Sequence, residues 1–155
     1  SLLAGALGFL CLNFPPAKII LGDVGAAFLG FVFAVLAIIA TRYDESRTSF
    51  LVIPMLMFNF IYDTSYTFIR RLISGKNVLE AHREHLYQLM NRGGFSHMEV
   101  VLTQYCMVFL QGLGALWITN IPGDERMLVF VPFLLFQLCY TWLVEKKARK
   151  ADVVW

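Results

Sequence analysis

One acidic residue is conspicuous because it directly precedes an apolar run. Asp23 lies between Gly22 and Gly25, where a polar loop would enter a bilayer. At a helix start its carboxylate can accept backbone N–H groups and meets the positive end of the helix dipole. The glycines also allow a tight backbone, from which the carboxylate could bind Mg²⁺ together with phosphate oxygens. Position alone favours the cap, because a single Asp cannot form a metal site.

A second group of polar residues lies in the longest polar stretch, residues 70–97, and contains His82, Arg83 and His85. The histidine spacing puts both rings on one helix face, but without a partnered acid an amphipathic helix at the membrane surface is the simpler interpretation. If these side chains and Lys18 gather near Asp23, the cations could neutralise a diphosphate substrate and its leaving group.

A third candidate, Asp63, lies inside an apolar segment, roughly 9 Å from its predicted cytoplasmic end at 1.5 Å per residue. Acids within a membrane are costly and usually functional. The alternative is a structural pair, because Arg70 and Thr67 share its helix face. Both interpretations of Asp63 remain open.

The elements that would position these residues are transmembrane helices. The chain has 155 residues, of which 58% are hydrophobic and only 15% charged, a composition typical of membrane proteins. Its three cysteines lie in apolar runs without CxxC spacing, which argues against a disulfide framework or a zinc site. We predict a single all-α domain, a polytopic bundle with a truncated span at residues 1–12 and four full spans at residues 24–41, 50–69, 98–119 and 127–144.

The polar stretch between the second and third full spans is predicted to contain an amphipathic helix on the membrane surface, ending at Gly93 and Gly94. Ser96 and Glu99 form a capping-box pattern that opens the next span. Ten of the 13 Lys and Arg residues fall on the side of the Asp23 loop, residues 70–97 and the basic tail, so this side is predicted to be cytoplasmic. The tail lacks interleaved aromatic residues, which favours anionic lipid over nucleic acid as its partner.

Two motifs resemble the polyprenyl-phosphate N-acetylhexosamine-1-phosphate transferases, glycosyltransferase family 4. They are Pro-Ala-Lys-Ile-Ile-Leu-Gly-Asp-Val-Gly-Ala-Ala-Phe-Leu-Gly, ending at Gly30, and Glu-Ala-His-Arg-Glu-His-Leu-Tyr-Gln at residues 80–88. The resemblance implies that Asp23 is a catalytic, metal-associated acid, with Mg²⁺ (or Mn²⁺) as cofactor. It also implies that His82, Arg83 and His85 hold the nucleotide-sugar diphosphate.

The family reaction implied is transfer of an N-acetylhexosamine 1-phosphate from a UDP-sugar to a polyprenyl (undecaprenyl) phosphate in the bacterial inner membrane, with release of UMP. The resemblance gives Asp63 and Arg70 no secure role. The family's upstream Asp-Asp motif and Asn/Asp-rich loop are absent, and Ala26 replaces a frequent Ser.

We therefore expect the C-terminal part of a longer transferase, inactive by itself. The alternative is a non-enzymatic membrane protein, either an ion-coupled transporter using Asp63 or a degenerate lipid-binding homologue. A transporter should show broken helices or repeat halves, and the sequence pattern indicates neither.

Overall fold

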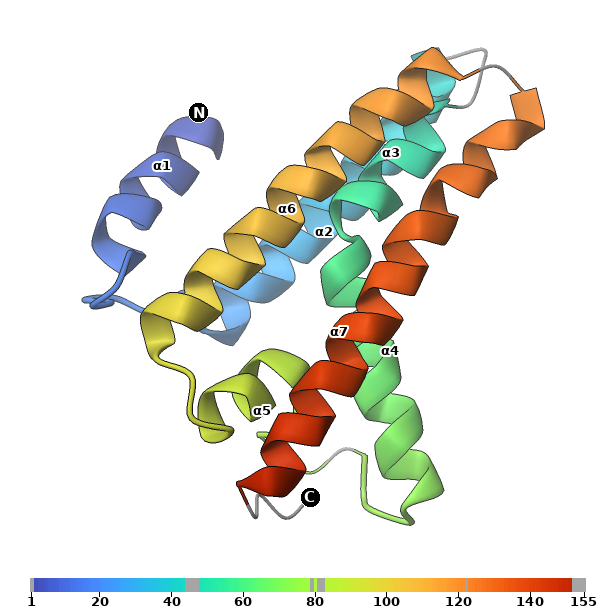
Figure 1. The fold of residues 1–155 in the computed structure, drawn as a ribbon. Coiled ribbons are helices and arrows are strands. Elements are labelled where there is room, and N and C mark those ends of the chain that lie inside the picture. Colours follow the sequence, from blue (N-terminus) through green and yellow to red (C-terminus); the bar gives the residue numbers. More distant parts are fainter. Residues whose placement is uncertain (1, 44–47, 79, 81–82, 122, 152–155) are drawn as a thin grey trace.

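The computed structural model describes residues 2–43, 48–78, 80, 83–121 and 123–151. Within these residues the fold is all-α, as predicted (Figure 1). The elements are α1 (Leu2–Asn13), α2 (Gly22–Tyr43), α3 (Thr48–Leu56), α4 (Phe58–Ile73), α5 (Leu86–Arg92), α6 (His97–Asn120), the 3₁₀ helix η1 (Gly123–Val129) and α7 (Phe130–Lys150).

Three helical segments in the described part of the chain are long and apolar enough to cross a membrane, namely Gly22–Tyr43, His97–Asn120 and Glu125–Lys150. They match three of the four predicted spans. The predicted capping box opens α6: the Glu99 N–H donates to Ser96 Oγ over 3.2 Å, and a Glu99 carboxylate oxygen accepts the Ser96 N–H over 2.7 Å. The polytopic membrane fold is therefore confirmed.

The predicted span at residues 50–69 is not one helix, because α3 ends at Leu56 and α4 begins at Phe58. Pro54 lies inside α3 and supplies no backbone N–H. The side chain of Gln111, which is 2% exposed, reaches the break from α6. With its amide in the orientation that satisfies both groups, Gln111 donates to the Leu56 carbonyl over 3.2 Å and accepts from the Asn59 N–H over 2.8 Å. A side chain inserted between turns thus satisfies the backbone groups that the break releases.

Helices α3, α6 and α7 pack closely at Gly114. A Cβ atom at this position would lie 2.6 Å from the Phe133 ring and 3.3 Å from the Met55 sulfur, so no larger residue fits without movement. Close approach at small residues is how membrane helices gain packing energy. Met55, Ala115, Ile118 and Val129 form the buried cluster around this contact.

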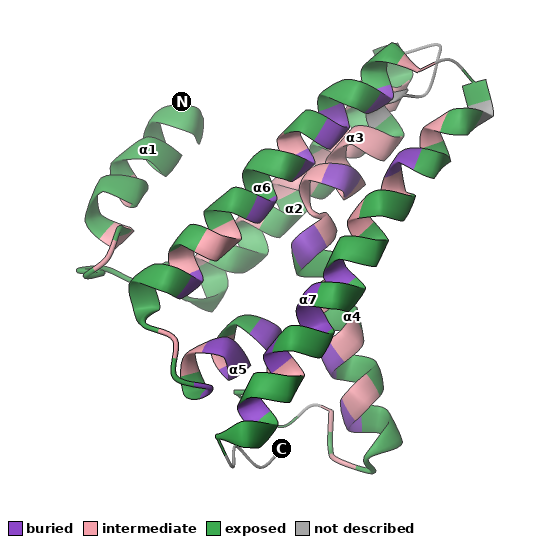
Figure 2. Ribbon diagram, in the orientation of Figure 1, coloured by how far each residue is buried: buried purple, intermediate pink, exposed green. Residues whose placement is uncertain are grey.

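The short helix α5 is part of the core. Leu86, Leu89 and Met90 are buried, and they form a second cluster with Val100 and Met107 of α6 and Tyr140 and Val144 of α7 (Figure 2). The predicted amphipathic segment thus contains a helix, α5, whose apolar face packs against α6 and α7.

Helix α1 lies apart from the bundle formed by α3, α6 and α7 (Figure 1), and neither α1 nor α2 contains a buried residue. Both helices are apolar and leave large side chains such as Leu3, Phe28 and Phe31 exposed. In a membrane, these faces are suited to contact lipid or further helices.

Candidate functional site

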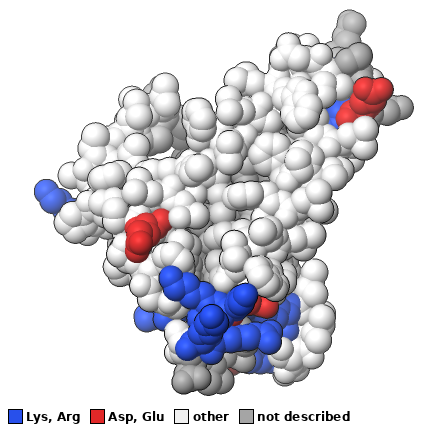
Figure 3. All heavy atoms as spheres, viewed as in Figure 1, with Lys and Arg blue, Asp and Glu red and all other residues white. Residues whose placement is uncertain are grey.

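The elements that carry the described candidate residues meet toward one end of the molecule. The helices α2 and α6 begin there, α4 and α7 end there, and α5 lies between them (Figure 1). Lys and Arg side chains gather at this end, over α5 and the last turns of α7 (Figure 3). His82 lies outside the described residues.

Asp23 occupies the first turn of α2, one residue after the helix begins at Gly22. Gly22 has φ of 69°, a left-handed conformation that favours glycine. The Asp23 and Lys18 side chains are exposed and, as far as the structure describes the chain, form no hydrogen bond or ion pair. The predicted cap is thus present as a favourable charge at the helix start, without a side-chain hydrogen bond.

Asp63 connects α4 to the histidine-containing segment. Its Oδ1 accepts the Leu86 N–H over 2.9 Å and the Thr67 hydroxyl over 3.2 Å. The same oxygen lies 3.5 Å from Nδ1 of His85. The carboxylate therefore accepts a backbone N–H at the start of α5 and lies beside the imidazole of His85.

The predicted pair of Asp63 with Arg70 is not formed. Arg70 instead donates to the Glu84 carbonyl over 2.7 Å, and its guanidinium lies 3.8 Å from the Glu145 carboxylate. The Tyr66 hydroxyl also donates to Glu145. Arg70 therefore joins α4 to α7 and to the segment before α5. Its contacts hold these elements together.

Glu84, the residue between Arg83 and His85, is at the centre of an ion-pair network. Its carboxylate accepts from Lys76 over 2.8 Å and lies 3.1 Å from the Arg71 guanidinium. Burial raises the pKa of Glu84, but the hydrogen bonds from Lys76 and Arg71 outweigh burial and leave the pKa below its ordinary value. The network fixes the conformation of the chain that carries Arg83 and His85.

A polar cavity of about 550 Å³ lies beside α5. Arg92 donates to the Arg83 carbonyl over 3.4 Å, so the two arginines are adjacent. The residues that line the cavity are Arg83, Tyr87, Gln88, Asn91, Arg92, His97 and Val100. Two guanidinium groups, amides and an aromatic ring suit a ligand that combines phosphates with a planar base.

Sequence reasoning identified Arg83 and His85 but missed Arg92, His97 and Glu84. Glu84 could have been found from its place inside the His-Arg-x-His motif. Arg92 could have been found because it lies four positions after Gln88, on the same helix face. No hydrogen bond or ion pair in the described residues joins Asp23 or Lys18 to Arg83 or His85. The structure therefore brings together only part of the predicted set.

A magnesium site draws its oxygen ligands from protein, water and phosphate. No group of three or more His, Cys, Asp or Glu side chains in the described ranges is placed to hold a metal ion. The Asp23 carboxylate would be one ligand, whereas a hard cation takes six or more oxygens, some of them from water or phosphate.

Comparisons with known proteins agree with these motifs. The family model for glycosyl transferase family 4 matches residues 1–41. No solved structure is significantly similar to the chain.

Three curated relatives indicate the same family. The chain is 32% identical over 151 residues to a probable undecaprenyl-phosphate N-acetylglucosaminyl 1-phosphate transferase of Bacillus subtilis, covering 95% of this chain and 42% of the relative. It is 31% identical to a decaprenyl-phosphate N-acetylglucosaminephosphotransferase of Mycobacterium tuberculosis, over 73% of this chain and 31% of the relative. An undecaprenyl-phosphate alpha-N-acetylglucosaminyl 1-phosphate transferase of Thermotoga maritima is 28% identical, over 90% of this chain and 43% of the relative. The chain thus spans less than half the length of each of these proteins.

Proposed function

Because the chain belongs to glycosyl transferase family 4, we propose that it forms part of a membrane transferase that moves an N-acetylhexosamine 1-phosphate from a UDP-sugar to a polyprenyl phosphate. A polyprenyl-phosphate oxygen attacks the phosphorus that carries the sugar. The bond from that phosphorus to the bridging oxygen breaks, and UMP leaves. The product begins a lipid-linked surface polysaccharide.

The observation that carries this proposal is the cavity beside α5. Arg83 and Arg92 supply two guanidinium groups to one space, and such groups bind phosphate oxygens in bidentate geometry. Tyr87 offers a ring face for the base, and Gln88 and Asn91 offer amides. We assign the UDP-sugar to this cavity, where the arginines neutralise charge that develops on the leaving UMP.

His85 is the residue directly before α5, the helix that borders this cavity, and its ring lies beside Asp63. The Asp63 carboxylate lies 3.5 Å from one imidazole nitrogen, and this contact helps to orient the ring and its other nitrogen. We propose that His85 contacts the diphosphate, that His82 contributes from the same motif, and that Asp63 acts only through His85 and α5.

Mg²⁺, with Mn²⁺ as an alternative, is proposed as the cofactor because hard cations stabilise phosphoryl transfer. Asp23 would supply one ligand, with Lys18 nearby along the chain to contact phosphate. The remaining ligands would come from substrate, water or other parts of the protein, so we expect the 155-residue chain to be inactive by itself.

The proposed setting is the inner membrane of a bacterium, with the site and the C-terminus in the cytoplasm. The basic side chains at one end of the molecule support this orientation (Figure 3). The proposed partners are the UDP-sugar, undecaprenyl or decaprenyl phosphate and membrane lipid; the sequence leaves oligomerisation open.

The broken helix α3–α4 bears on the alternative function. Broken helices are expected of a transporter, and the sequence pattern predicted none in this chain. That prediction was wrong, because the helix breaks between α3 and α4. In transporters, unwound backbone coordinates the cargo. Here the Leu56 carbonyl and the Asn59 N–H are bound to Gln111, which gives the break a structural role. The transferase is therefore the better supported function.

The test is UMP release from UDP-N-acetylglucosamine and undecaprenyl phosphate by the longer protein. Asp23→Asn should lower kcat by about 100-fold or more, and Arg92→Gln should raise KM for the UDP-sugar by about tenfold, the value of one lost charged hydrogen bond. Arg42→Gln, an exposed arginine in the last turn of α2, is the matched control. Wild-type turnover in Asp23→Asn would contradict the role of Asp23.

A further inference from the structure

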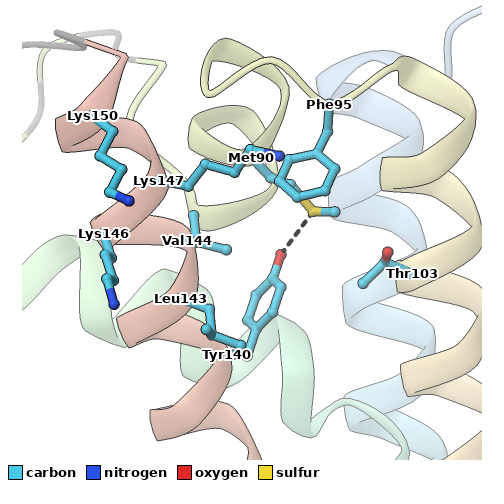
Figure 4. Close-up of a pocket in the computed structure, with 9 residues that line it drawn as sticks. All are labelled: Met90, Phe95, Thr103, Tyr140, Leu143, Val144, Lys146, Lys147 and Lys150. Atoms are coloured by element: carbon cyan, nitrogen blue, oxygen red, sulfur yellow. Dashed lines mark hydrogen bonds between the residues drawn. The ribbon is translucent and has the colours of Figure 1, made fainter.

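A second groove, distinct from the Arg83 cavity, lies between α5, α6 and the last turns of α7, with a volume of about 580 Å³. Its walls are mainly apolar: Met90 and Phe95 lie at one end, and Tyr140, Leu143 and Val144 line the side formed by α7 (Figure 4). The residues proposed to bind the UDP-sugar or the metal do not line it.

Three cations complete the groove. Lys146, Lys147 and Lys150, all from the last turns of α7, line it together with the apolar side chains (Figure 4). Within the described residues, none of them forms an ion pair with a carboxylate. Glu99 interacts electrostatically with Lys147, but its single negative charge offsets only one of the three cations. The groove is therefore positively charged.

The aromatic neighbours of these lysines indicate their depth in the membrane. Lys147 Nζ lies 3.4 Å from the centre of the Phe95 ring, and Lys146 Nζ lies 4.6 Å from that of Trp142. Trp142 is 58% exposed. An exposed Trp beside Lys at the end of an apolar helix is typical of the membrane–water interface. The lysines thus lie at the level of lipid headgroups.

We propose that this groove binds an anionic phospholipid of the surrounding bilayer. One acyl chain lies along Tyr140, Leu143 and Val144, and the headgroup phosphate lies among the lysines. Basic pockets between transmembrane helices on the cytoplasmic side favour such headgroups. The bound lipid would hold α5 against α7 and so support the segment that carries Arg83 and His85.

A bulk phospholipid suits the groove better than the polyprenyl-phosphate substrate. The substrate phosphate must reach the groups that act on the UDP-sugar, and none of those proposed here lines the groove. A structural lipid needs only an apolar wall, an anion site and access from the bilayer. The inference therefore goes beyond the proposed transferase function, and only the choice of phospholipid over substrate lipid rests on that function.

The experiment measures lipid retention. The purified protein is incubated in detergent with equal amounts of phosphatidylglycerol and phosphatidylcholine, and native mass spectrometry counts the bound lipids. Wild type should retain mainly phosphatidylglycerol. Replacing Lys146, Lys147 and Lys150 with Gln should reduce this retention by more than about tenfold, since about 1 kcal/mol per cation is lost.

Two further variants separate charge from shape. Arg149→Gln removes an exposed cation from the same turns of α7 that does not line the groove, and it should change retention by less than the matched Lys147→Gln. Thr103→Phe fills the groove from α6 and keeps every lysine, so it should also displace the lipid. Circular dichroism checks that each variant folds.

Three results would overturn the proposal. They are equal retention of phosphatidylcholine by wild type, full retention by both the triple lysine variant and Thr103→Phe, and displacement of the phospholipid by an equimolar amount of undecaprenyl phosphate. The last result would assign the groove to the substrate lipid. None of these measurements uses UDP-sugar turnover, so a failure here is distinguishable from a failure of the transferase proposal.

Discussion

At the level of single residues, Asp63 is the side chain whose role the structure clarifies most. The sequence left a functional role and a structural pair open, with Arg70 and Thr67 as candidate partners. The structure confirms the Thr67 contact, excludes a direct pair with Arg70 and adds the Leu86 N–H and the His85 ring. One carboxylate therefore caps α5 and orients a proposed substrate-binding histidine.

This arrangement predicts different effects for two substitutions. Asp63→Asn keeps an oxygen that can accept the Leu86 N–H, whereas Asp63→Ala leaves that donor unpaired, so Ala should cost about 1–3 kcal/mol of stability and Asn clearly less. Thermal unfolding in detergent and hydrogen exchange at the Leu86 amide measure the two effects. Equal destabilisation by Asn and Ala would exclude the capping role.

A pH prediction follows from Glu84, whose pKa in the folded protein lies below its ordinary value of 4.5. Because the pKa is lowered in the folded protein, the ion pairs of Glu84 with Lys76 and Arg71 stabilise the segment before α5 above about pH 4.5. This stabilisation is lost as the pH falls through the folded pKa. Proteolytic cleavage within residues 74–85 of the wild type should therefore become faster as the pH falls below about 4.5. In the Glu84→Gln variant, cleavage of the same segment should be fast at every pH. Acid-independent proteolysis of wild type would contradict this prediction.

At the level of elements, the break between α3 and α4 is held by a side chain from a third helix. Gln111→Leu would leave the Leu56 carbonyl and the Asn59 N–H without a partner in an apolar environment. We expect a loss of about 2–4 kcal/mol, because each buried unsatisfied group costs roughly 1–3 kcal/mol. Unfolding by sodium dodecyl sulfate from mixed micelles measures this loss.

The control is Thr119→Val on the same helix. Thr119 is exposed, and its hydroxyl donates only within α6, to the Leu116 carbonyl. Its replacement should change stability by less than about 0.5 kcal/mol. If Gln111→Leu were equally mild, α3 and α4 would have to join into one helix without Gln111.

A polar network extends from this break across the bundle. Asn59 of α4 donates to Gln104 of α6 and accepts from Gln137 of α7 over 2.7 Å. Hydrogen bonds between helices are favourable in a membrane because no water competes for these groups. The network fixes how α4, α6 and α7 meet, and so where the site at their common end is assembled.

At the level of the whole molecule, the uneven distribution of basic residues predicts the orientation in the membrane. A green fluorescent protein fused after Lys150 should fluoresce, because it would remain in the cytoplasm, while alkaline phosphatase inserted after Gly123 should be active outside. An active phosphatase at the C-terminus, with a non-fluorescent fusion at the same position, would reverse the assignment.

The sequence by itself determined the features that depend on neighbouring residues. Apolar runs located three spans, the Ser96–Glu99 pattern located the start of α6, and the two motifs containing Asp23 and Arg83 indicated the family. Each of these signals is local, since hydrophobic length and helix capping involve residues within a few turns.

Only the tertiary structure decided which distant residues meet. Asp63 and Leu86 are 23 positions apart and Asn59 and Gln137 are 78 apart, and no periodicity relates such pairs. The burial of α5, the break at Met57 and the cavity shared by Arg83, Arg92 and His97 arise from the packing of helices against one another. Packing depends on how all the apolar faces fit together, which the pattern of any single segment does not contain.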